Sequence, residues 1–168
     1  MLVYHPAFDL YNCIFRMLQL LKYSKEDEVQ LEKLRIWDFY LTFPSQVSDI
    51  VFPAHFFKLK QVFKDKHNPY EELSNPKQIF ERMKSFQLTA LKCLASYGFI
   101  DTKLLAKNII KKTDKELPEL LEKQLENLSV EKSNIIKLVT GPFYELPLYG
   151  QKGLKARTGL IEYKYDPK

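Results

Sequence analysis

A chain of 168 residues is sufficient for one domain, and its 45% hydrophobic and 28% charged residues are typical of a globular protein rather than a disordered one. The net charge of +5 excludes a histone-like polycation, but it permits contact with nucleic acid or an acidic partner. The sequence has no apolar run long enough to span a membrane and no signal peptide, which predicts a cytoplasmic protein without membrane contact.

The N-terminal part, about residues 1–97, is predicted to be helical. Apolar side chains recur at helical spacing over residues 8–23 and again over about 28–41. The first half of the second helix is amphipathic, whereas its second half, residues 34–41, is apolar on nearly all sides, which predicts central burial; Pro44 ends it. Shorter helical segments are predicted at 47–52 and 56–63.

The clearest helix of the sequence is predicted over residues 76–97. Asn75 is a favourable N-cap, Pro76 suits the first helical position, and Gly98 is a typical stop. In the apolar helix before it, Arg35 and Asp38 are three residues apart, which predicts an ion pair between them near the core.

The C-terminal part, about residues 98–168, is predicted to contain a winged-helix-like element. A short strand, a short helix, a second strand and two amphipathic helices are predicted at 99–100, 101–108, 109–113, 117–128 and 130–140. Residues 161–165 also read as a strand, which we expect to pair with 109–113 or 99–100 because so short a strand cannot stand alone. The predicted fold class is therefore mainly α with a small β-sheet (α+β), in which a helical bundle carries the winged-helix-like element within a single domain, 1–168.

A basic loop near the end of the chain is the first candidate contact site. Lys152, Lys155 and Arg157 lie within six residues, and glycines at 150, 153 and 159 bracket them. Glycine permits close backbone approach, and arginine suits bidentate contact with carboxylate or phosphate. We expect the three cations to contact an acidic partner surface or a nucleic-acid backbone, the alternative being a solvated loop.

A second group of cations surrounds the predicted short helix and strand. Lys107, Lys111 and Lys112, flanked by Lys103 and Lys115, could follow a phosphate backbone if this element is a winged helix. A solubilising lysine face is the alternative interpretation. Because arginine and asparagine are scarce beside these lysines, base-specific contact is not indicated.

No pattern of catalytic residues is present in the sequence. It lacks a P-loop motif and a nucleophile elbow, and its histidines and cysteines are not at metal-ligand spacing: His5, His55, His67, Cys13 and Cys93. The two cysteines fall in apolar helical patterns, which indicates buried free thiols. We therefore expect no enzymatic activity, no cofactor and no metal.

Three segments resemble one protein family. They are YHPAFDLYNCIFR at residues 4–16, LRIWDFYLTFP at residues 34–44, and KGLKARTGLIEYKYD at residues 152–166. Together they are similar to the middle components of three-component ABC-ATPase defence systems, the Lamassu-like anti-phage systems of bacteria.

The resemblance implies a non-catalytic accessory subunit. Its implied partners are an SMC- or Rad50-like ABC ATPase and an effector, commonly a nuclease, with DNA as a further candidate contact within the complex. The aromatic residues and the apolar region from Phe52 to Phe63 exceed the needs of one small core, which also favours a protein partner. The alternative is a free-standing winged-helix DNA-binding transcriptional regulator.

Overall fold

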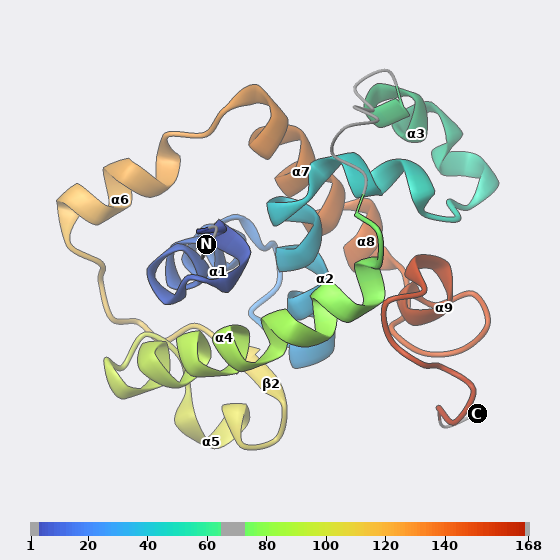
Figure 1. Ribbon diagram of the computed structural model, residues 1–168. Coiled ribbons are helices and arrows are strands. Elements are labelled where there is room, and N and C mark those ends of the chain that lie inside the picture. Colours follow the sequence, from blue (N-terminus) through green and yellow to red (C-terminus); the bar gives the residue numbers. More distant parts are fainter. Residues whose placement is uncertain (1–3, 65–72, 167–168) are drawn as a thin grey trace.

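The computed structural model describes residues 4–64 and 73–166, which form a mainly helical fold with a small sheet (Figure 1). The predicted mainly α fold with a small β-sheet is thereby confirmed. The α-helices of the described residues are α1 (Leu10–Tyr23), α2 (Leu31–Thr42), α3 (Phe57–Lys64), α4 (Pro76–Ser96), α5 (Thr102–Leu105), α6 (Glu119–Glu126), α7 (Val130–Thr140), α8 (Pro142–Glu145) and α9 (Leu154–Thr158). The short 3-10 helices are η1 (Pro6–Phe8), η2 (Pro44–Asp49) and η3 (Ala54–Phe56).

Helix α1 lies at the centre of the bundle and packs against α2, α4, α6 and α7 (Figure 1). Its N-cap is Asp9, whose carboxylate accepts a hydrogen bond from the Asn12 amide at 2.8 Å. This cap fixes the start of α1 within two residues of the predicted position, because a short polar side chain satisfies an amide that the helix leaves free.

Helix α2 is buried on every side, as its sequence predicts. Every residue from Lys33 to Leu41 is buried, including Trp37, and the helix packs against α1, α4 and α7. A helix surrounded in this way has no solvated face, which explains why its apolar residues do not form a single stripe.

Helix α4 confirms both of its predicted boundaries. The side chain of Asn75 accepts a hydrogen bond from the Gln78 amide at 3.0 Å, and Pro76 is the first helical residue. The helix ends just before Gly98, whose φ of +80° is left-handed backbone that favours glycine.

The sheet has two antiparallel strands, β1 (Glu28–Gln30) and β2 (Ile109–Lys111). Val29 pairs with Ile110, and both side chains are buried. Just outside the sheet, Ile100 forms an isolated bridge with Lys112, as expected for the predicted strand at 99–100.

Two predictions about the sheet are wrong. Residues 28–30 are a strand rather than the start of a helix, and residues 161–165 form turns rather than a strand. Segment 28–30 takes the place beside β2, and the Leu31 amide extends this pairing by donating to the Asn108 carbonyl at 2.9 Å. The sequence order of the winged-helix-like element is present, but its sheet is completed from the N-terminal part of the chain.

One hydrophobic core includes residues from both parts of the chain, from Ala7 to Leu160. Cys13 is fully buried there, and burial raises the pKa of its thiol, whereas Cys93 is partly buried; both are free thiols, as predicted. The Cys13 thiol is unreactive because its raised pKa keeps it protonated, whereas the thiolate is the nucleophilic form.

A buried polar network crosses this core between α1, α2 and α4. Arg16 donates to Asp38 from Nε to Oδ1 at 2.5 Å and from Nη2 to Oδ2 at 3.3 Å. Gln87 donates to Asp38 Oδ2 at 2.9 Å and accepts from Arg35 Nε at 2.8 Å. The predicted Arg35–Asp38 ion pair is therefore wrong: Asp38 pairs with Arg16, and Gln87 separates it from Arg35.

Candidate partner-binding surfaces

The predicted basic loop near the end of the chain folds into the short helix α9, and Lys155 on this helix is buried. Its ammonium group lies 2.9 Å from Glu32 Oε2 and 3.0 Å from Asp166 Oδ1, and 4.7 Å from the centre of the Tyr149 ring. Burial lowers the pKa of Lys155, but hydrogen bonds to the two carboxylates outweigh it and raise the pKa overall. Lys155 therefore holds the terminal segment against α2 and is not free to contact a partner.

Arg157 is also engaged within the chain. Its Nε donates to the Lys152 carbonyl at 2.6 Å, and its Nη1 donates to the Val51 carbonyl at 2.9 Å. Gly153 is required beside it, because a Cβ at this position would lie 2.3 Å from the Tyr149 carbonyl oxygen. Of the three cations predicted to make the contact, Lys152 alone is exposed.

We expect methionine at position 155 to destabilise the fold, whereas methionine at position 152 should not. Lys155→Met leaves Asp166, whose side chain is 10% exposed, without its cation, which should lower the free energy of unfolding by about 1–3 kcal/mol. Lys152→Met changes an exposed side chain, and its effect should stay within about 0.5 kcal/mol. Urea unfolding at pH 7 measures both, and equal stabilities of the two variants would show that the buried ion pairs contribute nothing.

The second group of predicted cations is divided among different surfaces. Lys111 lies 3.3 Å from Glu28 across the sheet, Lys112 lines a groove beside α1, and Lys107 lines a pocket on another side. The short helix predicted at 101–108 forms only as α5, four residues long, with Leu104 and Leu105 half-buried. A continuous phosphate-contacting face is therefore not formed, which weakens the transcriptional-regulator alternative.

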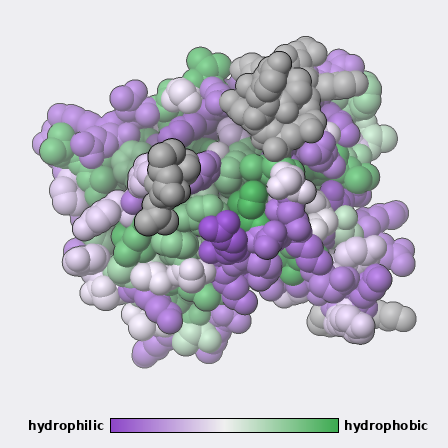
Figure 2. All heavy atoms as spheres, in the orientation of Figure 1, coloured by the Kyte–Doolittle hydropathy of each residue, from purple (hydrophilic) through white to green (hydrophobic). Residues whose placement is uncertain are grey.

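Exposed apolar side chains lie around α3 at the edge of the fold (Figure 1), where hydrophobic and hydrophilic residues are mixed on the surface (Figure 2). Val51 is 63% exposed, Phe57 60% and Val62 47%, and we call these three residues the α3 surface. A concavity of about 680 Å³ lies beside it, lined by Ile50, Phe52 and Phe57 among others. This is the region of Phe52 to Phe63 in which the sequence predicts apolar residues in excess of the core.

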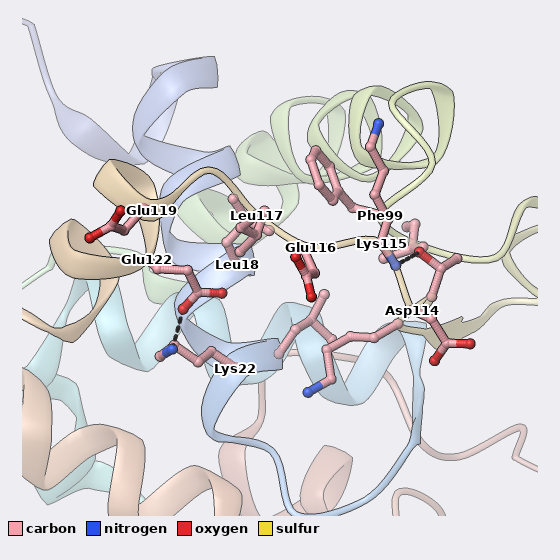
Figure 3. Close-up of a pocket in the computed structure, with 13 residues that line it drawn as sticks. Leu18, Lys22, Phe99, Asp114, Lys115, Glu116, Leu117, Glu119 and Glu122 are labelled. Atoms are coloured by element: carbon pink, nitrogen blue, oxygen red, sulfur yellow. Dashed lines mark hydrogen bonds and ion pairs between the residues drawn. The ribbon is translucent and has the colours of Figure 1, made fainter.

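A groove of similar volume, about 680 Å³, lies between α1, α6 and the segment that joins β2 to α6 (Figure 3). Leu18, Ile100 and Leu117 contribute apolar surface to it. Its charges are largely satisfied internally: Lys22 pairs with Glu122, and the Lys115 ammonium donates to the Tyr97 carbonyl and lies 4.7 Å from the Phe99 ring centre. The groove therefore shows no preference for ligands of one charge.

A third concavity, which we call the basic pocket, has a volume of about 640 Å³. It lies where α2, α4, the start of β2 and the terminal segment meet, and its cations are Arg35, Lys84, Lys107 and Lys155. The structure thus brings two predicted contact residues, Lys107 and Lys155, into one pocket. The sequence pattern missed Arg35 and Lys84, although an arginine inside an apolar helix is a signal for a specific partner.

The described residues contain no group of three or more histidine, cysteine or acidic side chains placed to hold a metal ion. His5 stacks on Phe43 with ring centres 5.2 Å apart, and the His55 ring lies 4.0 Å from that of Phe56. His67 lies outside the described residues. Over the same part of the chain, no helix has the length and apolarity needed to cross a bilayer.

Comparison with protein families matches residues 2–166 to the family described as ABC-three component (ABC-3C) system Middle Component 5. The match covers all three segments on which the sequence resemblance rests. Comparisons with curated proteins and with solved structures found no match.

Proposed function

The chain belongs to the ABC-three component (ABC-3C) system Middle Component 5 family, and on that premise we propose that it is a non-catalytic accessory subunit which links an ABC ATPase to an effector. The observation that carries this proposal is the family match over residues 2–166. In the proposed complex the ATPase is SMC- or Rad50-like, the effector is a nuclease, and the assembly acts in the cytoplasm against invading phage.

The distribution of residues supports a role in assembly rather than in chemistry. The sequence has no P-loop, and in the proposed complex ATP hydrolysis is assigned to the ATPase subunit. The buried charged side chains of Arg16 and Asp38 are bonded to each other and, through Gln87, hold three helices together. This pairing explains why two charged side chains are buried here, and no substrate is needed to account for them.

We assign the contact with the ATPase to the α3 surface. Phe57 and Val62 lie on one short helix at the edge of the fold, and exposed aromatic and aliphatic side chains of this kind form the centres of protein interfaces. The surface is also anchored to the rest of the molecule, since the Val51 carbonyl accepts from Arg157 and its amide donates to the Arg157 carbonyl at 3.1 Å. The terminal segment therefore fixes the position of Val51 in the contact surface.

Co-expression tests this function. The chain should co-elute in size-exclusion chromatography with the ABC ATPase encoded beside it, and ATP turnover should follow the ATPase subunit alone. Purified without partners, the chain should neither hydrolyse ATP nor cut plasmid DNA in the presence of magnesium. Turnover that stays with the isolated chain through repeated purification, or elution of the two proteins as separate species, contradicts the proposal.

A further inference from the structure

The basic pocket concentrates positive charge in a concave site. Among the described residues that line it, Glu32 is the one carboxylate, against the cations Arg35, Lys84, Lys107 and Lys155. Glu32 already accepts from Lys155 at 2.9 Å. No ion pair joins Lys84 or Lys107 to a carboxylate within the described part of the chain, so the pocket keeps an excess of positive charge.

Arg35, which lines this pocket, has a buried donor atom without an acceptor. The residue is 4% exposed, its Nε donates to Gln87 at 2.8 Å, and its guanidinium group lies 4.4 Å from the centre of the Phe80 ring. These two contacts fix the side chain in place. Its Nη2 is buried and has no hydrogen-bond acceptor in the structure. A buried N–H of a charged group is costly to leave unpaired, so an anionic ligand is the natural partner.

We propose that the basic pocket binds a terminal phosphate group, either of a nucleotide or of a nucleic-acid strand. A phosphate monoester carries close to two negative charges and presents three acceptor oxygens, which suits a pocket lined by one fixed guanidinium group and two exposed lysines. A volume of about 640 Å³ exceeds the needs of a single carboxylate and lies within the range of small-molecule sites. Tyr149, 40% exposed at the pocket, offers ring surface to the group that bears the phosphate.

The proposal goes beyond the accessory function, because it assigns a ligand to the chain itself. The pocket and the α3 surface share no lining residue. Binding of phosphate can therefore be measured on the isolated full chain, with no ATPase present, and its failure would leave the assembly proposal standing.

Isothermal titration calorimetry at low salt tests the pocket with four probes: inorganic phosphate, adenosine 5′-monophosphate, and one single-stranded oligonucleotide with either a 5′-phosphate or a 5′-hydroxyl. The wild-type chain should bind the first three and discriminate by about tenfold or more against the 5′-hydroxyl strand. Tighter binding of the mononucleotide assigns the site to nucleotides, and tighter binding of the phosphorylated strand assigns it to strand ends. Both results support a phosphate site.

Two double variants, one in the pocket and one outside it, make the test specific. Lys84→Gln with Lys107→Gln should weaken phosphate binding by about tenfold or more, since each removes a charged donor at the pocket. The control, Lys92→Gln with Lys103→Gln, removes the same charge from exposed positions on α4 and α5 outside the pocket and should bind as the wild type does. Equal loss in both variants, equal binding of the two strands, or no binding of phosphate at millimolar concentration would overturn the proposal. Tighter binding of a polyglutamate peptide than of any phosphate probe would also overturn it.

Discussion

Replacing Asp38 by alanine is expected to lower the free energy of unfolding by about 3–5 kcal/mol, the largest loss of stability that we expect from a single substitution in this chain. Asp38 is fully buried and is the counter-ion of Arg16, which is itself 5% exposed. Its removal leaves a buried guanidinium group with the Pro6 carbonyl, at 2.9 Å, and also deprives Gln87 of an acceptor. For a domain of this size, thermal unfolding should shift downward by about 6–20 °C.

Two further variants separate the lost ion pair from other effects. Asp49→Ala removes a carboxylate from an exposed position and should change stability by about 0.5 kcal/mol or less. Arg16→Met combined with Asp38→Leu should recover most of the loss, because two apolar side chains leave no unpaired charge in the core. If Asp38→Ala unfolds at the same temperature as Asp49→Ala, the network does not stabilise the packing of α1, α2 and α4.

Introducing aspartate at Phe57 and Val62 together is expected to abolish detectable binding to the ATPase while leaving the chain folded. Both side chains are largely exposed, so the free chain loses little packing. At an interface the same change buries two carboxylates opposite an apolar partner, which should weaken binding by about 30-fold or more. Pull-down of the variant with the tagged ATPase, followed by titration, measures the effect.

Leu120→Asp is the matched control for this experiment. Leu120 is 71% exposed on α6, away from the α3 surface, and the substitution also exchanges an exposed apolar side chain for a carboxylate. It should bind the ATPase as the wild type does. The circular dichroism spectra of the wild type, the α3 variant and Leu120→Asp should be the same, which shows that all three are folded. Reduced binding by Leu120→Asp, with the α3 variant unaffected, would transfer the interface to α6.

The sequence predicts the helices well because their signals are local. Asn75 with Pro76 marks the start of α4, and Gly98 marks its end, through contacts within a few residues. β1 was missed for the opposite reason: three residues in a polar segment form a strand only because Ile109–Lys111 lies beside them. Because β1 pairs with β2, residues 161–165 do not form the strand that was predicted to lie there.

Functional surfaces were harder to predict than helices, because charge alone does not show where a side chain points. Lys155 and Lys152 look alike in the sequence, yet one is buried between Glu32 and Asp166 and the other is exposed. Replacing the three loop cations by glutamate would therefore destabilise the fold, since Lys155→Glu places a third carboxylate beside Glu32 and Asp166. The cations of the basic pocket come from separate parts of the chain, so no contiguous sequence motif marks it.

Hydrogen–deuterium exchange of the chain, free and in complex with its ATPase, tests the central claim most directly. We expect a stable complex in which amides of residues 51–63 become protected, because the ATPase covers the α3 surface. Amides of α1 and the centre of α4 should exchange equally slowly in both states, since they lie in the core. A complex in which residues 51–63 exchange as fast as in the free chain, or the absence of any complex, would contradict the assignment of this chain as an accessory subunit that binds the ATPase through α3.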